Sequence, residues 1–285
     1  MFDINELNKK YKVHTQSSLQ CRNGLEIIEK ILLTYKKGIK YNYCETGSYY
    51  GGTLLPRLNS QYCSKCLSID KRVDCSPDER REKGYSYKVV NTTMMISILK
   101  DHLNKKKLEK LECFDGTIQE YLISKSNSFK EKKFDWIFID AEHTNIASVN
   151  DFLSSMPLIS KNGVIAMHDS WMIFSAISNL SSFLDYLKIK YRFAHIDGAV
   201  SAFFFGEIAE VSKKFDKYFI TTDQNLFVKN SRDQLWNYQT NEILKEPINI
   251  LLSCKLVVQR YLNRVIYVIF RIPFKLNEII QKLLN

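Results

Sequence analysis

Short apolar runs alternate with amphipathic stretches along residues 18–206. Within 18–36, apolar residues such as Leu25 and Ile28 recur at helical spacing, which predicts an amphipathic helix. Seven apolar runs predict strands, namely Tyr41–Glu45, Cys66–Asp70, Leu111–Phe114, Phe134–Asp140, Gly163–His168, Tyr191–Ile196 and Val200–Phe205. Three further helices are expected, one after the glycine-bearing turn Thr46–Gly52 and the others over Ile146–Ile159 and Ser170–Leu187.

This alternation predicts an α/β fold, a doubly wound and mostly parallel Rossmann-like sheet with helices on both faces. The last two strands are joined only by the turn at Asp197 and Gly198, so one of them must run antiparallel. In parallel sheets of this kind, ligands bind beyond the carboxyl ends of the strands. The residues that follow each strand are therefore the first candidates for a site.

The polar insert Lys71–Asn91 follows the second predicted strand and lies over this edge. We expect a loop there, and two interpretations stay open: a lid or substrate loop, or an ordinary surface connection.

Composition sets broad limits on the function. The chain of 285 residues carries 41 Lys and Arg against 31 Asp and Glu, a net charge of +10. That balance fits nucleic acid, a membrane surface or an anionic substrate, but the basic residues are dispersed and no nucleic-acid motif is present. Seven cysteines, no apolar leader and no membrane-spanning run favour a cytoplasmic protein with reduced thiols.

The segment CETGSYYGGT (44–53) joins a predicted strand to a predicted helix. Glu45 stands at the strand end, and Gly47 and Gly51 allow the backbone to approach a ligand beside free helix N–H groups. The spacing differs from G-x-G-x-x-G, which disfavours a dinucleotide pyrophosphate. Asp70 ends the next strand 23 residues after Gly47, near the spacing at which an acidic residue binds ribose hydroxyls.

The densest set of reactive residues lies within Phe134–Ser170. Asp140 ends one strand, His143 follows it, and His168 and Asp169 end the next strand. Adjacent strands lie about 4.8 Å apart, so these residues should cluster. Aspartate oxygens can bind Mg²⁺, and a histidine can accept a proton near neutral pH.

Taken together, CETGSYYGG, CLSID, FIDAEH and GVIAMHDS resemble class I S-adenosylmethionine-dependent methyltransferases over roughly residues 20–206. More narrowly, they resemble the branch with D-G-x-H and H-D strand ends, which includes metal-dependent sugar and glycan O-methyltransferases. Ala141 and Asn162 replace the usual glycines, and His168 stands where related enzymes often have an acidic ligand.

The resemblance implies a role for each matching residue. Glu45, Gly47 and Gly51 would line the methionine part of S-adenosylmethionine, Asp70 would hold the ribose, and Asp115, Gly116 and Thr117 would lie near the adenine. His143 and Asp140 would be catalytic, with His143 as the general base, and Asp140, Asp169 and His168 would be the ligands of a divalent metal such as Mg²⁺.

The cysteines offer a second metal hypothesis. Cys63, Cys66 and Cys75 could begin a zinc site, but a structural zinc needs four ligands and no fourth is close in the sequence.

Residues 207–285 form a carboxyl-terminal appendage to the predicted domain 1–206, because the strand–helix alternation stops after Gly206. From Ser253 onward there are six basic residues and one acidic residue among apolar ones. Such a basic amphipathic helix suits an anionic membrane surface, or it packs on its own domain or on a second subunit.

The sequence therefore predicts an O-methyltransferase that acts on a hydroxyl, on a sugar or glycan by the resemblance. Two alternatives stay open: an NAD(P)-dependent oxidoreductase and a non-catalytic cofactor-binding scaffold at a membrane. We expect a small-molecule or glycan substrate and no nucleic acid, and a homo-oligomer is left open.

Overall fold

The computed structural model describes residues 3–86, 88–125, 133–197 and 199–245. The chain divides into two compact units, residues 1–235 and 236–285. The first contains the whole sheet. The described part of the second is the end of helix α10 (Gln224–Lys245). The predicted basic helix over 253–285 lies outside the described residues, and no helix within them is long and apolar enough to span a membrane.

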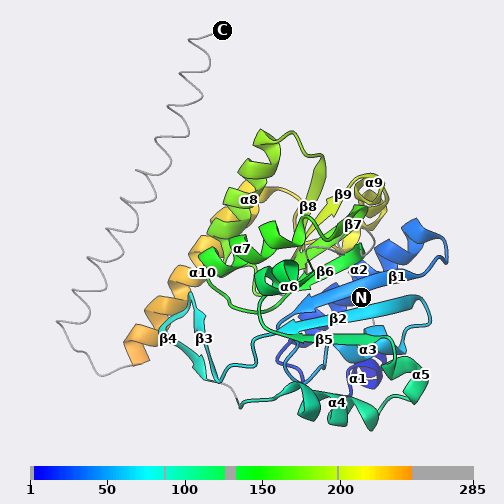
Figure 1. The fold of residues 1–285 in the computed structure, drawn as a ribbon. Coiled ribbons are helices and arrows are strands. Elements are labelled where there is room, and N and C mark those ends of the chain that lie inside the picture. Colours follow the sequence, from blue (N-terminus) through cyan, green and yellow to red (C-terminus); the bar gives the residue numbers. More distant parts are fainter. Residues whose placement is uncertain (1–2, 87, 126–132, 198, 246–285) are drawn as a thin grey trace. The chain divides into compact units, whose positions relative to one another are not determined.

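A seven-stranded sheet forms the centre of the first unit, in the order β5-β2-β1-β6-β7-β9-β8 (Figure 1). The strands are β1 (Tyr41–Thr46), β2 (Cys63–Asp70), β5 (Leu111–Asp115), β6 (Phe134–Ile139), β7 (Ile159–Met167), β8 (Tyr191–Asp197) and β9 (Val200–Phe205). The first five in this order pair in parallel, and β9 runs antiparallel to both β7 and β8. The predicted α/β fold with an antiparallel strand is confirmed.

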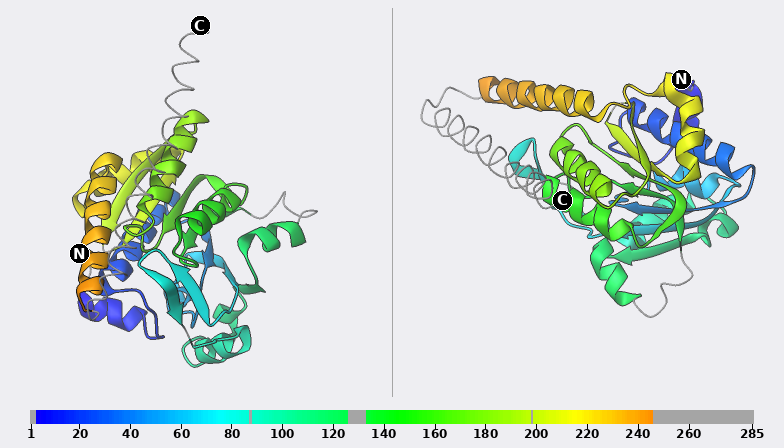
Figure 2. Two further views of the ribbon diagram at one scale, coloured as in Figure 1. Left: turned by 90° about the vertical axis from the view of Figure 1, so that its left-hand side faces the viewer. Right: turned by 90° about the horizontal axis from the view of Figure 1, so that it is seen from above.

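Helices cover both faces of this sheet (Figure 2). One apolar core contains side chains from α2 (Leu19–Lys36), α3 (Leu54–Asn59), α4 (Thr92–Lys100) and α9 (Glu207–Ser212). The other core contains side chains from α6 (Ile118–Ser124), α7 (Asn145–Ser155) and α8 (Phe174–Tyr186). The remaining helices are α1 (Ile4–Lys10), α5 (Lys105–Leu108) and the 3-10 helix Lys213–Tyr218.

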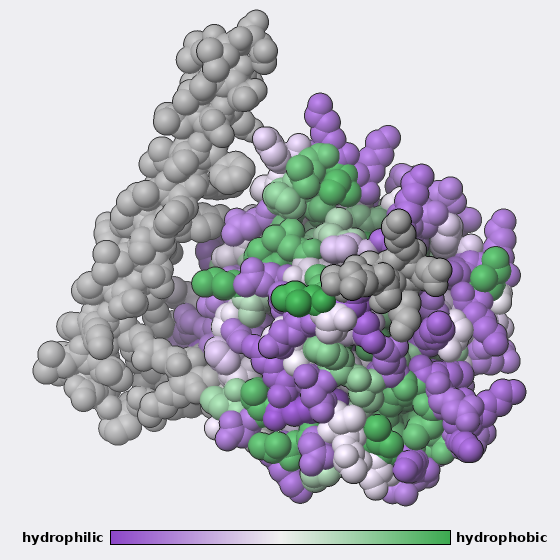
Figure 3. Space-filling model, viewed as in Figure 1, coloured by the Kyte–Doolittle hydropathy of each residue, from purple (hydrophilic) through white to green (hydrophobic). Residues whose placement is uncertain are grey.

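Strand β6 shows why the sheet is buried on both faces. Its alternate residues Trp136 and Phe138 belong to the first core, while Ile137 and Ile139 belong to the second. Successive side chains of a strand point to opposite faces, so a run that is apolar throughout needs helices on both sides. Polar side chains cover most of the outer surface in view, with apolar ones scattered among them (Figure 3).

A buried cluster of charged side chains joins helices α2 and α3. The Arg57 guanidinium lies against Glu26 and places Nη1 3.1 Å from Glu29 Oε2, and its side chain is 1% exposed. The central carbon of the Arg57 guanidinium, Cζ, lies 4.9 Å from the centre of the Trp136 ring. Removing one partner would leave an uncompensated buried charge, so this cluster fixes α2 and α3 against each other.

Three predicted boundaries differ from the structure by four residues each. Helix α7 ends at Ser155 and not at Ile159, because Pro157 has no N–H with which to continue the helical hydrogen bonds. Strand β7 already begins at Ile159, and helix α8 begins at Phe174, four residues later than predicted.

The insert 71–91 was expected to be a loop, and this prediction is wrong in part. It contains β3 (Cys75–Asp78) and β4 (Arg81–Ser86), which pair antiparallel as a separate two-stranded sheet. A half-buried strand is predicted from alternating apolar and polar residues. The insert is too polar to show this alternation, so the sequence did not predict that its two strands pair.

Candidate functional site

A cavity of about 930 Å³ lies beyond the carboxyl ends of the parallel strands. Its walls come from the segments that follow β1, β2, β5, β6 and β7, as the topology predicts. The loop 14–18 before α2 also lines it, which sequence analysis did not anticipate. This loop contacts the glycine turn closely: a Cβ on Gly52 would lie 2.5 Å from the His14 carbonyl oxygen.

Four backbone hydrogen bonds extend the sheet pairing just beyond the strands. Gly116 N–H donates to the Asp70 carbonyl (3.0 Å), and Gly47 N–H to that of Ile69 (2.8 Å). Asp140 N–H donates to the Thr46 carbonyl, and His168 N–H to the Ile139 carbonyl, each at 2.9 Å. These bonds fix the predicted site residues in register at one edge of the sheet.

Gly47 occupies the tightest point of the cavity wall. Its φ is +83°, and a Cβ there would lie 2.1 Å from the Asp140 carbonyl oxygen. Both the backbone conformation and the close approach therefore require glycine. Gly51 also has a positive φ, +81°, but it packs against Met95 and Leu99 and is not among the lining residues.

Glu45 lies behind the turn, and it does not line the cavity. Its carboxylate accepts hydrogen bonds from the hydroxyls of Tyr43 (2.5 Å) and Thr53 (2.6 Å). Burial disfavours the charged form and raises the pKa of Glu45 to about 7, although both hydroxyls act in the opposite direction. Glu45 therefore supports the turn from within the core.

Asp70 lies on the cavity wall at the end of β2. Its carboxylate accepts the backbone N–H groups of Tyr49 and Arg72, each at 2.8 Å, which ties the glycine turn to β2. Two carboxylate oxygens offer about four acceptor sites, so capacity remains for ligand hydroxyls.

The three residues expected near an adenine lie in different environments. Gly116 and Thr117 line the cavity, and the Thr117 hydroxyl caps helix α6. Asp115 does not line it: its side chain is 57% exposed and contacts Thr92 and Arg72.

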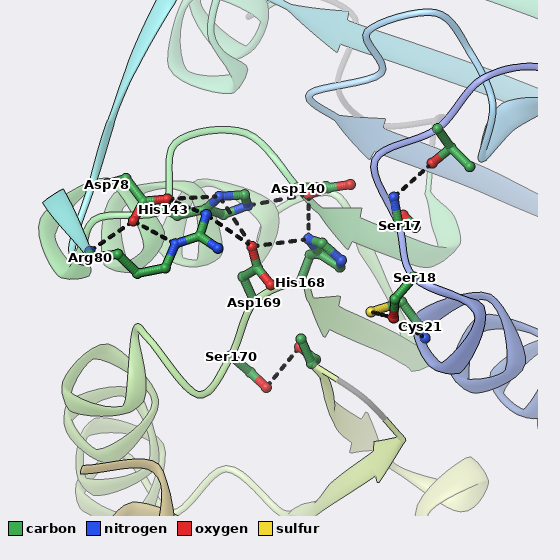
Figure 4. A network of polar contacts seen from close by, with 12 residues as sticks. Ser17, Ser18, Cys21, Asp78, Arg80, Asp140, His143, His168, Asp169 and Ser170 are labelled. Carbon is green, nitrogen blue, oxygen red and sulfur yellow. Dashed lines mark hydrogen bonds and ion pairs between the residues drawn. The ribbon is translucent and has the colours of Figure 1, made fainter. Parts of the chain in front are cut away.

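The histidine and aspartate residues predicted to cluster do so (Figure 4). Asp140 Oδ1 lies 3.2 Å from His143 Nε2 and 2.8 Å from His168 Nδ1. Asp169 Oδ2 lies 3.6 Å from His143 Nδ1 and 3.8 Å from His168 Nδ1. The sheet thus brings two carboxylates and two imidazoles together at the cavity.

The charges in this cluster shift one another's protonation. Burial would raise the pKa of Asp140, but the neighbouring His168 and His143 outweigh it and lower that pKa to about 2. Burial would lower the pKa of His168, yet Asp140 and Asp169 hold it well above its ordinary value. Burial alone would raise the pKa of the Cys21 thiol, but the contact with His168 lowers it below its ordinary value.

The tip of the β3–β4 hairpin also lies at the site; the sequence analysis left a substrate loop open for 71–91 but named none of the residues at this tip. Asp78 pairs through both carboxylate oxygens with Arg80 (2.9 and 2.7 Å), and Asp78 Oδ2 lies 3.9 Å from His143 Nδ1. Arg80 Nη2 lies 3.8 Å from Asp169 Oδ2. Glu79 bonds to the backbone of His143 and Asn145. The only sequence signal is the run of charges at 78–82 within the insert.

The donor atoms of this cluster do not match the Mg²⁺ that the sequence resemblance implies. Among the described residues, the group of side chains able to share an ion is Asp140, His143 and His168, whose donor atoms lie within 4.8 Å of one another. Asp169, expected as a ligand, is outside this group. Mg²⁺ prefers oxygen ligands, and two of the three donors are imidazoles, so the set does not suit it.

The cysteines do not form a metal site within the described residues. Cys63 and Cys66 lie buried with their sulfur atoms 3.4 Å apart, and Cys75 is exposed on the separate hairpin. Among the residues that the structure describes, no group of side chains able to share an ion includes Cys63, Cys66 or Cys75.

Comparisons with known proteins support the catalytic class. Residues 44–170 match the family model of a methyltransferase domain. In a comparison of folds, the O-methyltransferase NovP is 13% identical, covering 68% of this chain and 84% of its own, with a TM-score of 0.51. No curated protein sequence matches. The family match supports a methyltransferase, and the fold comparison agrees with the Rossmann-like architecture.

Two more distant structures are similar. An O-methyltransferase from Bacillus cereus in complex with S-adenosylhomocysteine is 14% identical, with 70% and 88% of the two chains covered and a TM-score of 0.44. The methyltransferase MycE of the mycinamycin pathway, in complex with Mg and S-adenosylhomocysteine, is 13% identical, with 73% and 56% covered and a TM-score of 0.48.

Gly47→Ala should separate the glycine turn from the Asp140 loop. We expect a loss of S-adenosylhomocysteine affinity of at least tenfold by calorimetry, because the methyl group needs space that the Asp140 carbonyl occupies. Gly38→Ala is the matched control, since Gly38 has a φ of +87° with nothing within 4 Å. That variant should show only the cost of the left-handed backbone, about 1–2 kcal/mol of stability. Equal affinity in the two variants would contradict the close-approach argument.

Glu45→Gln should change how stability depends on pH. A carboxyl whose pKa rises from 4.5 to about 7 on folding stabilises the folded state below pH 4.5 and loses this contribution as pH rises towards 7. Glutamine does not titrate, so urea unfolding at pH 5 and pH 8 should show the variant gaining up to about 3 kcal/mol relative to wild type. A difference that does not vary with pH would show that Glu45 is ionised in the folded state.

Proposed function

We propose that this chain is an S-adenosylmethionine-dependent O-methyltransferase that acts on a hydroxyl of a sugar or glycan. The observation that carries the proposal is the meeting of the Gly47 turn, Asp70 and the Asp140–His143–His168 cluster at one cavity. A nucleoside site and a proton-accepting site are then close enough to serve one transfer reaction.

In this proposal the cofactor follows the strand ends. The ribose hydroxyls would bind Asp70, and the adenine would lie towards Gly116 and Thr117, which line the same wall. The methionine part would contact the backbone at Gly47, which lines the same wall. This placement directs the sulfonium towards Asp140 and His143.

His143 is the proposed general base. Its Nε2 lies 3.2 Å from Asp140 Oδ1, and the low pKa of Asp140 keeps that carboxylate charged. Asp140 therefore orients the imidazole and stabilises it once protonated. Asp78 and Asp169, near the Nδ1 side of the ring, add to this stabilisation.

The reaction requires little covalent chemistry from the protein. The acceptor oxygen forms a bond to the methyl carbon while the carbon–sulfur bond breaks, its electron pair stays on sulfur, and the hydroxyl proton passes to His143. The products are the methyl ether and S-adenosylhomocysteine. Holding the two reactants in line supplies several kcal/mol of the barrier reduction. No step is assigned to Mg²⁺, because the donor set does not suit it.

The remaining cavity wall supports a sugar as the acceptor. Trp171, Val73 and Ile146 provide apolar surface, and Ser76 and Asn150 provide hydrogen-bonding groups. A sugar ring has apolar C–H faces and a polar rim, so it matches a mixed wall of this kind.

Contact between 253–285 and an anionic membrane stays a prediction from the sequence.

The alternatives make different predictions. An NAD(P)-dependent oxidoreductase would bind a pyrophosphate at the glycine turn, but the turn lacks the G-x-G-x-x-G spacing. A non-catalytic scaffold would bind the nucleoside and need no base. Titration with NAD⁺ identifies the first alternative, and loss of turnover in a base variant excludes the second.

Asp70→Asn and His143→Ala test the proposal as a pair. In calorimetric titrations with S-adenosylhomocysteine we expect micromolar affinity for wild type and at least tenfold weaker binding for Asp70→Asn, about 1.4 kcal/mol. His143→Ala should bind within threefold of wild type but fail to transfer labelled methyl groups to a panel of mono- and oligosaccharides.

Wild-type protein that binds no S-adenosylhomocysteine would contradict the methyltransferase proposal. Equal loss of affinity in both variants would show that His143 is structural, and labelling of a different acceptor class would remove the sugar.

A further inference from the structure

Helices α6 and α7 lie side by side, and both contribute side chains to the cavity wall (Figure 1). Ile118 and Gln119 come from the first turn of α6, directly after the turn that ends β5. Ala147 and Asp151 come from α7, and their spacing of four places them on one face of that helix. The cavity is therefore bounded on this side by two helices and not only by strand ends.

One side-chain hydrogen bond joins the two helices at this wall. Gln119 Nε2 donates to Asp151 Oδ1 over 3.2 Å. Within the described part of the chain, no group donates a hydrogen bond to Asp151 Oδ2 or to Gln119 Oε1. Both side chains are only partly exposed, so a ligand that covers these two oxygens without offering a donor would bind at a cost.

The bond also decides what the pair can offer to a ligand. An amide nitrogen only donates and an amide oxygen only accepts, so the contact through Nε2 leaves Gln119 Oε1 as an acceptor. Burial raises the pKa of Asp151 to about 6, although the bond from Gln119 acts in the opposite direction. Above pH 7 the carboxylate is therefore ionised and accepts through Oδ2. The pair presents two acceptors at one wall.

Apolar surface adjoins these acceptors. Ile118 precedes Gln119 in α6, and Ala147 lies one turn before Asp151 in α7. A flat heterocycle with an amino group at its edge matches such a wall, because its faces are apolar and its amino group donates two N–H bonds. Adenine has this amino group at position 6. Hypoxanthine has a carbonyl oxygen there, which would face two acceptors.

We infer that Asp151 and Gln119 recognise the adenine of the cofactor through its 6-amino group and so select adenine over hypoxanthine. The inference deepens the proposed function and rests on it, because that proposal directs the adenine towards Gly116 and Thr117. Asp70 binds ribose hydroxyls whatever base is attached, so selection of the base needs residues of its own. Asp151 and Gln119 supply it from the helices beside the strand ends.

Calorimetric titration of the full chain at pH 8 tests the inference with two probes. These are S-adenosylhomocysteine and S-inosylhomocysteine, in which hypoxanthine replaces adenine. Wild type should bind S-inosylhomocysteine at least tenfold more weakly, because the 6-carbonyl leaves both acceptor oxygens without a donor. The readout is the ratio of the two affinities, which a general loss of stability does not change.

Two variants should lower this ratio at least threefold. In Asp151→Asn, the amide oxygen can still accept from Gln119, and its N–H groups can donate to the 6-carbonyl. Gln119→Met removes the amide and keeps a side chain of similar length, and it serves if Asp151→Asn does not fold. Glu142→Gln is the matched control: it removes one negative charge from the cavity wall and keeps an oxygen for the Thr144 hydroxyl, so the ratio should not change.

Equal affinities in wild type, or an unchanged ratio in the folded variants, would overturn the inference and leave the methyltransferase proposal intact, because S-adenosylhomocysteine still binds. An equal fall of the ratio in Glu142→Gln would also overturn it, since charge and not hydrogen bonding would then select the base. Wild type that binds neither probe would contradict the proposed function, and the inference with it.

Discussion

The candidate site depends on the register of the parallel sheet at its carboxyl edge. Backbone hydrogen bonds carry the pairing past the strands to Gly47, Gly116, Asp140 and His168, so four loops leave the sheet at fixed positions. The bare backbone of Gly47 then lets its turn touch the Asp140 loop directly. In the proposed function, cofactor and acceptor meet because these two loops leave from adjacent strands, β1 and β6, and Gly47 places no side chain between them.

Charge balance is the second constraint. Asp78, Asp140 and Asp169 place three carboxylates around the His143 ring, and His168 and Arg80 offset their charge. The hairpin that carries Asp78 and Arg80 bonds to the backbone of the His143 loop through Glu79. The insert is therefore part of the wall that orients the proposed base, and its polar sequence reflects that position.

Much of this arrangement follows from sequence because it depends on local pattern and topology. Apolar runs such as 134–139 locate the buried strands, and residues that end adjacent parallel strands must meet, as Asp140 and His168 do. The hairpin pairing and the loop at His14 could not be predicted, since both result from tertiary contacts between polar segments. The side-chain directions of Glu45 and Asp115 could not be predicted either. At the end of a strand, a shift of one residue decides whether a side chain points into the core, into the cavity or into solvent.

A crystal structure of the complex with S-adenosylhomocysteine tests the central claim most directly, since that claim concerns where one ligand lies. We expect the ribose hydroxyls on the Asp70 carboxylate, the amino-acid end at the Gly47 turn, and the sulfur facing Asp140 and His143. A nucleoside bound elsewhere on the chain, or bound here with its sulfur directed away from His143, would contradict the account.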